Sequence, residues 1–408
     1  MATLAADASS REVTAPVQRI ASVDVFRGLT MVVMIFVNDL ADVRGLPWWT
    51  YHAHANQDVM TYVDMVFPFF LFAVGLSLPI AVRARLRKSA SIGALLWHVF
   101  SRSAGLVVLG LLLANAEKGD PARMALSPSA WALLGLAGAV LFWHVPSSDP
   151  RRRRFSVYLR VAGLALLCIT FALFRRATPT GSAGWIDGSY PEILGLIGYS
   201  YFSAAILFIV TRRWIWAPLV WMAALLALCS EVTLHHFHLH LPLYFWPVGM
   251  GGMTSIIMAG VCTSNIFFAE QKLESPARQF SLAGAFALAC AFAGWLLTPL
   301  GISKIRETPT WCLYSTAAAI AMLTLLYWIC DRMHKTRWAA PIHPAGANTL
   351  LTYLLPDIYY YLAALLGFTY LDTHLNFGIA GVMRSIAFVL VILGVSAVAT
   401  RARLRLQL

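Results

Sequence analysis

The chain has 408 residues, of which 59% are hydrophobic and only 12% are charged, and its mean hydropathy is +0.69. A soluble domain has about 25% charged residues, so this composition excludes an ordinary soluble protein and predicts an all-α, polytopic bundle of transmembrane helices. The net charge is +12, but no basic run is interleaved with aromatic residues in the way that single-strand binding requires. We therefore expect the lipid bilayer as surroundings and no nucleic-acid partner.

The first 18 residues are small and polar, and no apolar stretch precedes Arg19. This pattern argues against a cleaved signal peptide. We expect a flexible cytoplasmic tail at 1–18 and a single transmembrane domain at 19–408. The six cysteines lie in apolar segments without CxxC spacing, which predicts small buried hydrophobic side chains rather than a disulfide framework or a metal site.

Apolar stretches of about 20 residues are typical of helices that cross a bilayer. The weakest of those in this chain are the fourth and the eleventh, so we expect 11 or 12 helices in all. The eleventh contains Pro356 and Asp357, which predict a kink or a break. The stretches lie at 25–43, 62–82, 92–114, 127–145, 155–174, 191–211, 215–233, 249–269, 280–300, 311–330, 346–368 and 378–400.

Lysine and arginine are distributed unequally between the connecting segments. The segments after even-numbered stretches, with the C-terminal tail, contain 18 of them, whereas those after odd-numbered stretches contain 7. Because basic residues concentrate on the cytoplasmic side, we expect both termini in the cytoplasm and the protein in the cell inner membrane. His52 and His54 then face the opposite side.

Two histidines, His52 and His54, stand in the polar run YHAHANQD just before the apolar stretch that contains Asp64. An ionisable group at a membrane boundary is a functional candidate by default because it is costly there unless paired or wetted. Imidazole acts near neutral pH as a general base or as an acyl-carrying nucleophile. Asp39, Asp58 or Asp64 would orient it. The alternative is a pair of solvated loop histidines.

Further polar groups lie at membrane depth or at the predicted helix ends. Asp24 and Arg27 are three residues apart, which places them on one helix face, where they pair with each other or hold an anionic ligand. The remaining candidates either line a polar path through the bundle or cap and pack helices; they are Asn38, Asp39, Glu192, Asn348, Thr352 and Asp357. The run HHFHLHLP at 235–242 has no tight zinc spacing, so we expect no metal.

Three motifs carry a family resemblance. They are RIASVDVFRG at 19–28, TYVDMVFPFFLFAVG at 61–75 and PAGANTLLTY at 344–353. Together, in this order, they resemble the heparan-α-glucosaminide N-acetyltransferase family of transmembrane acyltransferases, especially its bacterial branch. Individually each is weak, but the combination spans most of the chain.

The resemblance implies transfer of an acetyl group from cytoplasmic acetyl-CoA, the co-substrate, to an amino sugar across the membrane. It also implies a catalytic histidine on the loop before Asp64. The lysosomal pattern aligns with His54 and the bacterial one often with His52; of the two, we choose His54. The residues expected to line the path for acetyl-CoA are Asp24, Arg27, Asn38, Glu192 and Asn348.

The lysosomal family pattern has Trp-Asn-Gly where this chain has Gln57, Asp58 and Val59. This departure leaves the sugar or amino-sugar acceptor open. The oligomeric state is also open, a homodimer included. A secondary transporter for a sugar, in which buried carboxylates carry protons, is the alternative function.

Overall fold

The computed structural model describes residues 20–88, 91–146, 149–235, 251–269 and 275–408. These residues form helices almost throughout, and the only strands among them are a two-residue antiparallel pair, β1 (Arg176–Ala177) and β2 (Ala183–Gly184). The helices are α1 (Ala21–Leu40), α2 (Val66–Arg87), α3 (Ile92–Ala116), α4 (Pro128–Trp143), α5 (Pro150–Leu173), α6 (Glu192–Thr211), α7 (Ala217–Thr233), α8 (Gly251–Phe268), α9 (Pro276–Leu296), α10 (Pro309–Leu326), α11 (His343–Ala347), α12 (Thr349–Leu366), α13 (Tyr370–His374) and α14 (Gly378–Arg401).

The all-α membrane fold predicted from hydropathy is confirmed. Ten of the described helices are long and apolar enough to cross a membrane, and α4 and α7 are shorter apolar helices. Together they account for the twelve predicted stretches. Of the kink or break predicted at Pro356, the break is wrong, because α12 continues as one helix through this residue; the kink stays a prediction. The helix is interrupted earlier, at Asn348, whose non-helical backbone (φ −129°, ψ 51°) separates α11 from α12.

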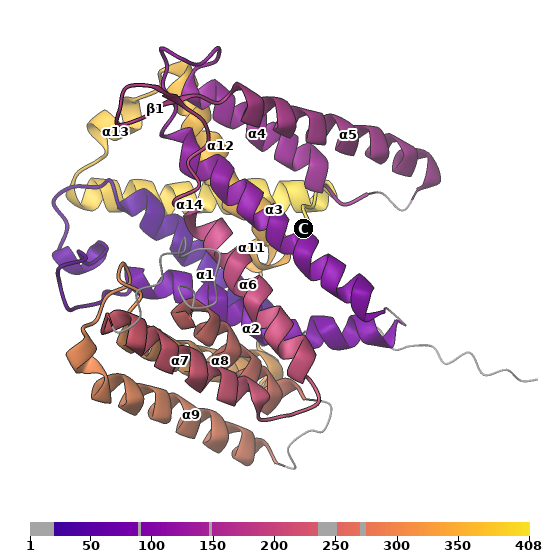
Figure 1. The fold of residues 1–408 in the computed structure, drawn as a ribbon, viewed down its shortest axis with the longest axis vertical. Coiled ribbons are helices and arrows are strands. Elements are labelled where there is room, and N and C mark those ends of the chain that lie inside the picture. The colour runs from indigo at the N-terminus through magenta and orange to yellow at the C-terminus, as the bar shows by residue number, and fades with distance from the viewer. Residues whose placement is uncertain (1–19, 89–90, 147–148, 236–250, 270–274) are drawn as a thin grey trace, which may run out of the picture.

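The centre of the bundle is formed by α1, α2 and α8, with the α4–α5 pair towards one end of the molecule and α9 towards the other (Figure 1). The packing of α2 against α8 depends on glycine. A Cβ atom on Gly75 would collide with the carbonyl oxygen of Ile257, and one on Gly260 would collide with that of Phe72. Gly75 and Gly260 therefore permit the close approach of α2 and α8.

Large apolar side chains cover the outer faces of α5, α9 and α14. Val161, Leu288 and Leu390 are each more than 60% exposed, as expected for helix faces that contact lipid. Cys168 on α5 is exposed as well, so the prediction of burial is wrong for this cysteine, because its side chain lies on an outward face. Cys229, Cys290, Cys312 and Cys330 are buried as predicted.

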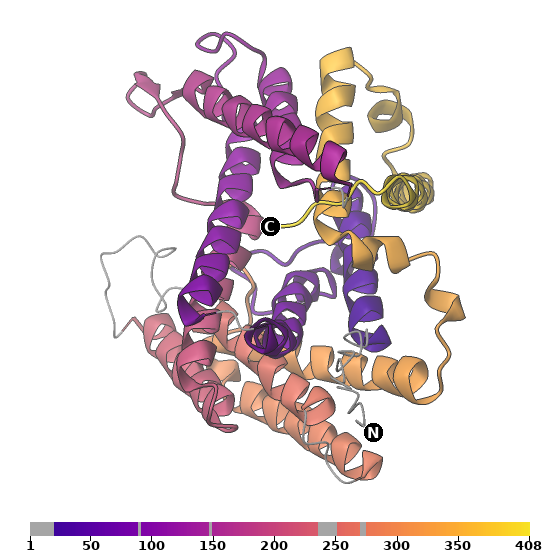
Figure 2. The same cartoon turned by 90° about the vertical axis from the view of Figure 1, so that its right-hand side faces the viewer.

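Loops that the charge distribution assigns to the same side of the membrane contact one another. The Asp331 carboxylate, which follows α10, accepts hydrogen bonds from the backbone N–H groups of Ala21 and Ser22 at the start of α1, both at 3.1 Å. After α14 the chain runs back towards the middle of the molecule (Figure 2), where the backbone oxygen of Arg405 accepts a hydrogen bond from the N–H of Val145 after α4. These contacts agree with alternating passage of the helices across the bilayer.

Candidate functional site

His52 and Asp64 form a hydrogen-bonded pair where the loop after α1 enters α2. The distance from His52 Nδ1 to Asp64 Oδ1 is 2.7 Å; the Asp64 side chain is 1% exposed and that of His52 is 42% exposed. Asp64 lies in the short 3-10 turn Val63–Met65, so the backbone fixes its side chain. The pair combines a buried, immobile carboxylate with an accessible imidazole.

The other oxygen of Asp64 holds the loop in place. Its Oδ2 accepts hydrogen bonds from the N–H of Thr61 at 3.0 Å and the N–H of Ala53 at 3.3 Å, and the Thr61 hydroxyl lies 3.3 Å away. Donors directed at a carboxylate favour its ionised form, and an ionised carboxylate only accepts. His52 therefore carries its proton on Nδ1, and the lone pair of Nε2 points away from Asp64.

His54 has a different environment from His52. Its side chain is exposed, and its backbone N–H donates to Gln57 Oε1 at 3.2 Å. Side chains two positions apart in an extended segment lie on the same face, so the spacing does not choose between the two rings, whereas the contact of His52 with Asp64 does. The structure therefore brings His52, and not His54, to the carboxylate that orients an imidazole.

Lys304 lies on the other side of the His52 ring. Its Nζ is 3.4 Å from His52 Nε2, although 252 residues separate the two in sequence. Burial lowers the pKa of Lys304 below its usual value, while Asp64 and Glu192 act in the opposite direction. The sequence analysis missed this residue. The one signal for it in the sequence is that it is a lysine in a segment after an odd-numbered stretch, where lysine and arginine are few.

The segment that carries Lys304 is attached to the histidine loop at further points. Arg306 forms an ion pair with Asp58, which also accepts the N–H of Ile302 at 3.3 Å. The hydrogen bond from Arg306 holds the pKa of Asp58 below its usual range. The Trp311 indole donates to the backbone oxygen of Asp64 at 3.1 Å. Residues 301–311 thus pack against the histidine loop and enclose the site from the side of Lys304.

Asp39 is buried at the end of α1, and its contacts are with α12 and α14. Tyr360 donates to Oδ1 at 2.8 Å, Ser385 donates to Oδ2 at 2.6 Å, and Arg384 lies 3.3 Å from Oδ2. This arrangement joins three helices and occupies both oxygens of the carboxylate. Asn38, the preceding residue, is exposed. Of the carboxylates proposed to orient a histidine, the structure thus brings Asp64 into contact with one.

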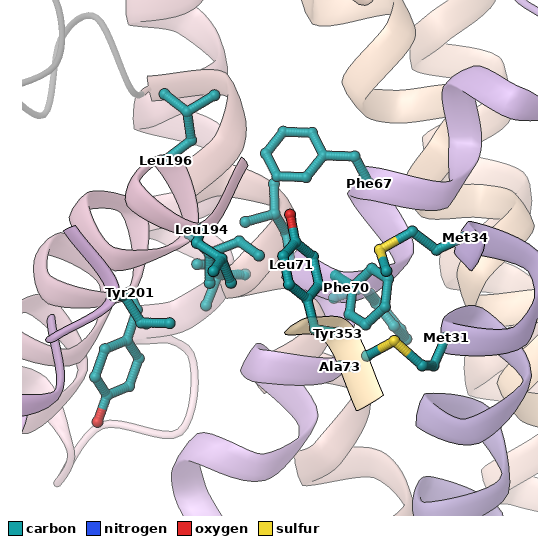
Figure 3. Close-up of a cluster of buried hydrophobic side chains, with 14 of the residues drawn as sticks. Met31, Met34, Phe67, Phe70, Leu71, Ala73, Leu194, Leu196, Tyr201 and Tyr353 are labelled. Carbon is teal, nitrogen blue, oxygen red and sulfur yellow. The ribbon is translucent and has the colours of Figure 1, made fainter. Parts of the chain in front are cut away.

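Glu192 and Tyr353 meet inside the bundle. The Tyr353 hydroxyl lies 3.0 and 3.1 Å from the two oxygens of Glu192, and Glu192 has a strained positive φ of 59° at the start of α6. Figure 3 shows Tyr353 among apolar side chains of α1, α2 and α6, including Met34, Phe70 and Leu194. A polar contact thus lies within the apolar core; a polar path through the bundle stays a prediction.

Arginine side chains gather in the part of the bundle formed by α1, α2 and α3. Arg27 is bound to Asp24 at 2.6 Å, so the predicted pair is present, and both side chains are partly buried. The Arg102 guanidinium lies 5.2 Å from the centre of the Tyr201 ring. Arg27 and Arg85 are both close enough to Arg102 to interact with it electrostatically. The cluster carries more positive charge than Asp24 neutralises.

Asn348 binds the C-terminal tail. Its side-chain amide nitrogen donates to the backbone oxygen of Leu404 at 2.9 Å and to the Thr400 hydroxyl at 3.3 Å, and its oxygen accepts from the N–H of Leu406 at 3.2 Å. The residue is 2% exposed. The structure therefore places Asn348 in a structural contact at the break between α11 and α12.

Within the part of the chain that the structure describes, no three His, Cys, Asp or Glu side chains form a group that would hold a metal ion. Of the histidine run at 235–242, only His235 is described; the remainder lies outside the described residues.

The fold and the His52–Asp64 pair define a polytopic membrane protein with a histidine–carboxylate site at the end of its bundle. The family model described as "Domain of unknown function (DUF5009)" matches residues 19–233, more than half of the chain. The chain belongs to this family. It is also similar to heparan-alpha-glucosaminide N-acetyltransferase, the similarity that its motifs predicted.

The human protein of that name is 31% identical over 122 residues, which are 30% of this chain and 17% of the relative. The mouse protein is 30% identical over 137 residues, which are 34% of this chain and 19% of the relative. The similarity therefore covers about a third of the chain and less than a fifth of either relative.

Proposed function

We propose that this protein is a membrane acyltransferase that moves an acetyl group from cytoplasmic acetyl-CoA to a sugar or amino sugar on the opposite side of the membrane. The observation that carries the proposal is the 2.7 Å contact between His52 and the buried Asp64. A carboxylate that fixes the tautomer of an accessible imidazole is the arrangement that general bases and nucleophilic histidines use. The similarity to two proteins named N-acetyltransferases supports the same class.

The arginine cluster suits the donor end of the reaction. Acetyl-CoA carries several phosphate groups, and guanidinium groups bind phosphate through paired hydrogen bonds. Arg27 and Arg102 are the candidate ligands, and Asp24 orients Arg27 through their 2.6 Å ion pair. The Glu192–Tyr353 contact, within the core, would line the path of the pantetheine arm. We assign the cluster to the cytoplasmic face of the inner membrane, with both termini on that side.

His52 has two chemically reasonable roles. As a base, Nε2 removes a proton from the acceptor while the acceptor attacks the thioester. As an acyl carrier, Nε2 attacks the thioester itself and passes the acetyl group on in a second step. In both roles Asp64 keeps the proton on Nδ1 and stabilises the positive charge that the ring acquires. Asp39 and Asn348 would support this site by holding the surrounding helices and the C-terminal tail.

The test uses purified full-length protein with acetyl-CoA and a panel of amino sugars that begins with glucosamine. Release of the CoA thiol and the mass of the acetylated sugar are measured for wild type, His52→Ala and the matched variant His54→Ala. We expect no turnover from His52→Ala and nearly full turnover from His54→Ala. The assignment fails if His54→Ala alone is inactive, and the function fails if wild type neither acetylates nor hydrolyses.

A sugar transporter is the second candidate because Glu192, a carboxylate within the bundle, is the kind of group that carries protons in transport. Proton-coupled sugar uptake into vesicles separates the two functions. Uptake that survives His52→Ala and is lost in Glu192→Gln would favour the transporter.

A further inference from the structure

The position of Lys304 is fixed by its own segment as well as by the histidine loop. The Ser303 N–H donates to the Thr308 hydroxyl at 3.0 Å, and the Thr308 N–H donates to the Ser303 oxygen at 3.1 Å. Asp58 holds the neighbouring Ile302 and Arg306. A half-buried lysine on so constrained a segment costs more to keep beside an imidazole than a mobile surface lysine does. This cost calls for a functional explanation.

Both ring nitrogens of His52 have a neighbouring charged side chain. Asp64 binds Nδ1 at 2.7 Å, and Lys304 stands 3.4 Å from Nε2, the atom at which the proposed chemistry occurs. With Nδ1 protonated, the lone pair of Nε2 is the acceptor and the ammonium group is the donor. The ammonium group of Lys304 therefore faces Nε2 directly. It also lies within reach of any atom that reacts there.

We propose that Lys304 is a catalytic residue of this acyltransferase, whose ammonium group donates a hydrogen bond to the oxyanion that forms on the thioester carbonyl of the acetyl donor. The proposal rests on the function proposed above. A donor directed at the developing negative charge stabilises it most effectively when it lies about 3 Å from the position of the oxyanion and is already in place before the reaction. Lys304, held beside Nε2 by a constrained segment, meets the second requirement.

The step balances without another reagent. The lone pair of the acceptor nitrogen forms a C–N bond with the carbonyl carbon, the π pair of the C=O bond moves to oxygen, and Nε2 takes a proton from the nitrogen. The oxyanion then restores the C=O bond, the C–S bond breaks, and the thiolate of CoA receives the proton from Nε2. Lys304 begins and ends as an ammonium group. If Nε2 itself attacks the thioester, the same oxyanion forms at the same carbon.

The position of Lys304 also explains when its ammonium group becomes available to the oxyanion. While Nε2 is neutral, it accepts the hydrogen bond of Lys304. Once Nε2 takes a proton or bonds to the acetyl carbon, it no longer accepts, and the ammonium group turns to the negative oxygen that appears at the same moment. Asp64 and Glu192, the two carboxylates that interact with Lys304, favour its charged form throughout these steps.

The experiment compares wild type with Lys304→Met, Lys304→Arg, His52→Ala and the control Lys118→Met. Lys118 follows α3 and pairs with Asp187 at 2.8 Å, so its loss removes a lysine–carboxylate contact that does not involve the Lys304 segment. Release of the CoA thiol from acetyl-CoA, with glucosamine as the acceptor, gives kcat and KM between about pH 6 and pH 10. Thermal unfolding of each variant reports any structural loss.

We expect Lys304→Met to lower kcat about 10²–10³-fold with little change in the KM for acetyl-CoA, as for the loss of one oxyanion donor. Lys304→Arg keeps part of the activity, and the alkaline limb of its pH profile moves upward because guanidinium does not deprotonate. Lys118→Met behaves as wild type. A purely structural lysine would lower the melting temperature and leave the pH profile of the arginine variant unchanged.

Two outcomes overturn the proposal, and they distinguish an error about Lys304 from an error about the function. If wild type is active, His52→Ala is inactive and Lys304→Met keeps the wild-type kcat, only the role of Lys304 is wrong. If wild type releases no thiol from acetyl-CoA with any acceptor, the proposed function fails and the role of Lys304 fails with it.

Discussion

Replacing Asp64 with asparagine changes the charge of the site while keeping its shape. Two backbone N–H groups, those of Ala53 and Thr61, converge on Oδ2. Because these groups can only donate, the amide oxygen of the Asp64→Asn variant must occupy the Oδ2 position, and its NH₂ group then faces His52 Nδ1. Since two donors cannot share a hydrogen bond, the imidazole must move its proton to Nε2. The reacting atom then loses its lone pair.

The expected loss in kcat for Asp64→Asn is about 10⁴-fold, the loss that a wrong histidine tautomer produces. The stability should change much less, because the two hydrogen bonds to the Oδ2 position are retained and one hydrogen bond is worth about 1 kcal/mol net. The assay is thiol release from acetyl-CoA, with thermal unfolding of the same preparations. The control is Asp120→Asn, which removes the charge of a partly buried carboxylate paired with Arg123, away from the His52 site.

The double variant His52→Ala/Asp64→Asn sharpens this test. If Asp64 acts only through His52, the double variant is no less active than His52→Ala alone, because residues that act as a unit are not additive. The reasoning is refuted if Asp64→Asn keeps a kcat within a few-fold of wild type while His52→Ala is inactive.

Three further predictions concern stability and pH. Gly75→Ala should lower the melting temperature, because the new Cβ collides with the oxygen of Ile257, whereas Gly284→Ala, which meets nothing within 4 Å, should not; equal effects would contradict the close packing of α2 and α8. Burial raises the pKa of Glu307 from 4.5 to about 8, so the folded state holds this proton more tightly than the unfolded state. Wild type should therefore lose stability as the pH rises between these two values, and Glu307→Gln should lose less; parallel pH profiles of melting would show otherwise. Asn348→Ala should lower the melting temperature and leave the KM for acetyl-CoA unchanged, and a raised KM would instead place Asn348 on the donor path.

The membrane fold was predictable because the bilayer imposes a simple rule on the sequence. Each backbone polar group in the apolar layer must be bonded within its own helix, so apolar stretches of sufficient length become helices wherever they occur. The interruption at Asn348 was not predictable by this rule, since it depends on the hydrogen bonds from its side chain to the tail at 400–406. Pro356, by contrast, does not interrupt its helix.

Part of the candidate site was also predictable from the sequence, and part required the folded structure. The His52/His54 loop and Asp64 could be located from the residues alone, because Ala53, Thr61 and Asp64 lie within about a dozen positions and short segments restrict their own geometry. The choice of His52 over His54 required the folded chain, because only the folded chain shows which of the two rings contacts Asp64.

Helix packing decides which distant residues meet. Lys304 reaches His52 across 252 positions, and Arg384 reaches Asp39 across 345. No local propensity or period records such pairs, because they arise from how whole helices pack and not from the conformation of either segment. The sequence thus specifies which helices form and which groups are costly to bury, and the packing of those helices supplies the partners that make such groups tolerable.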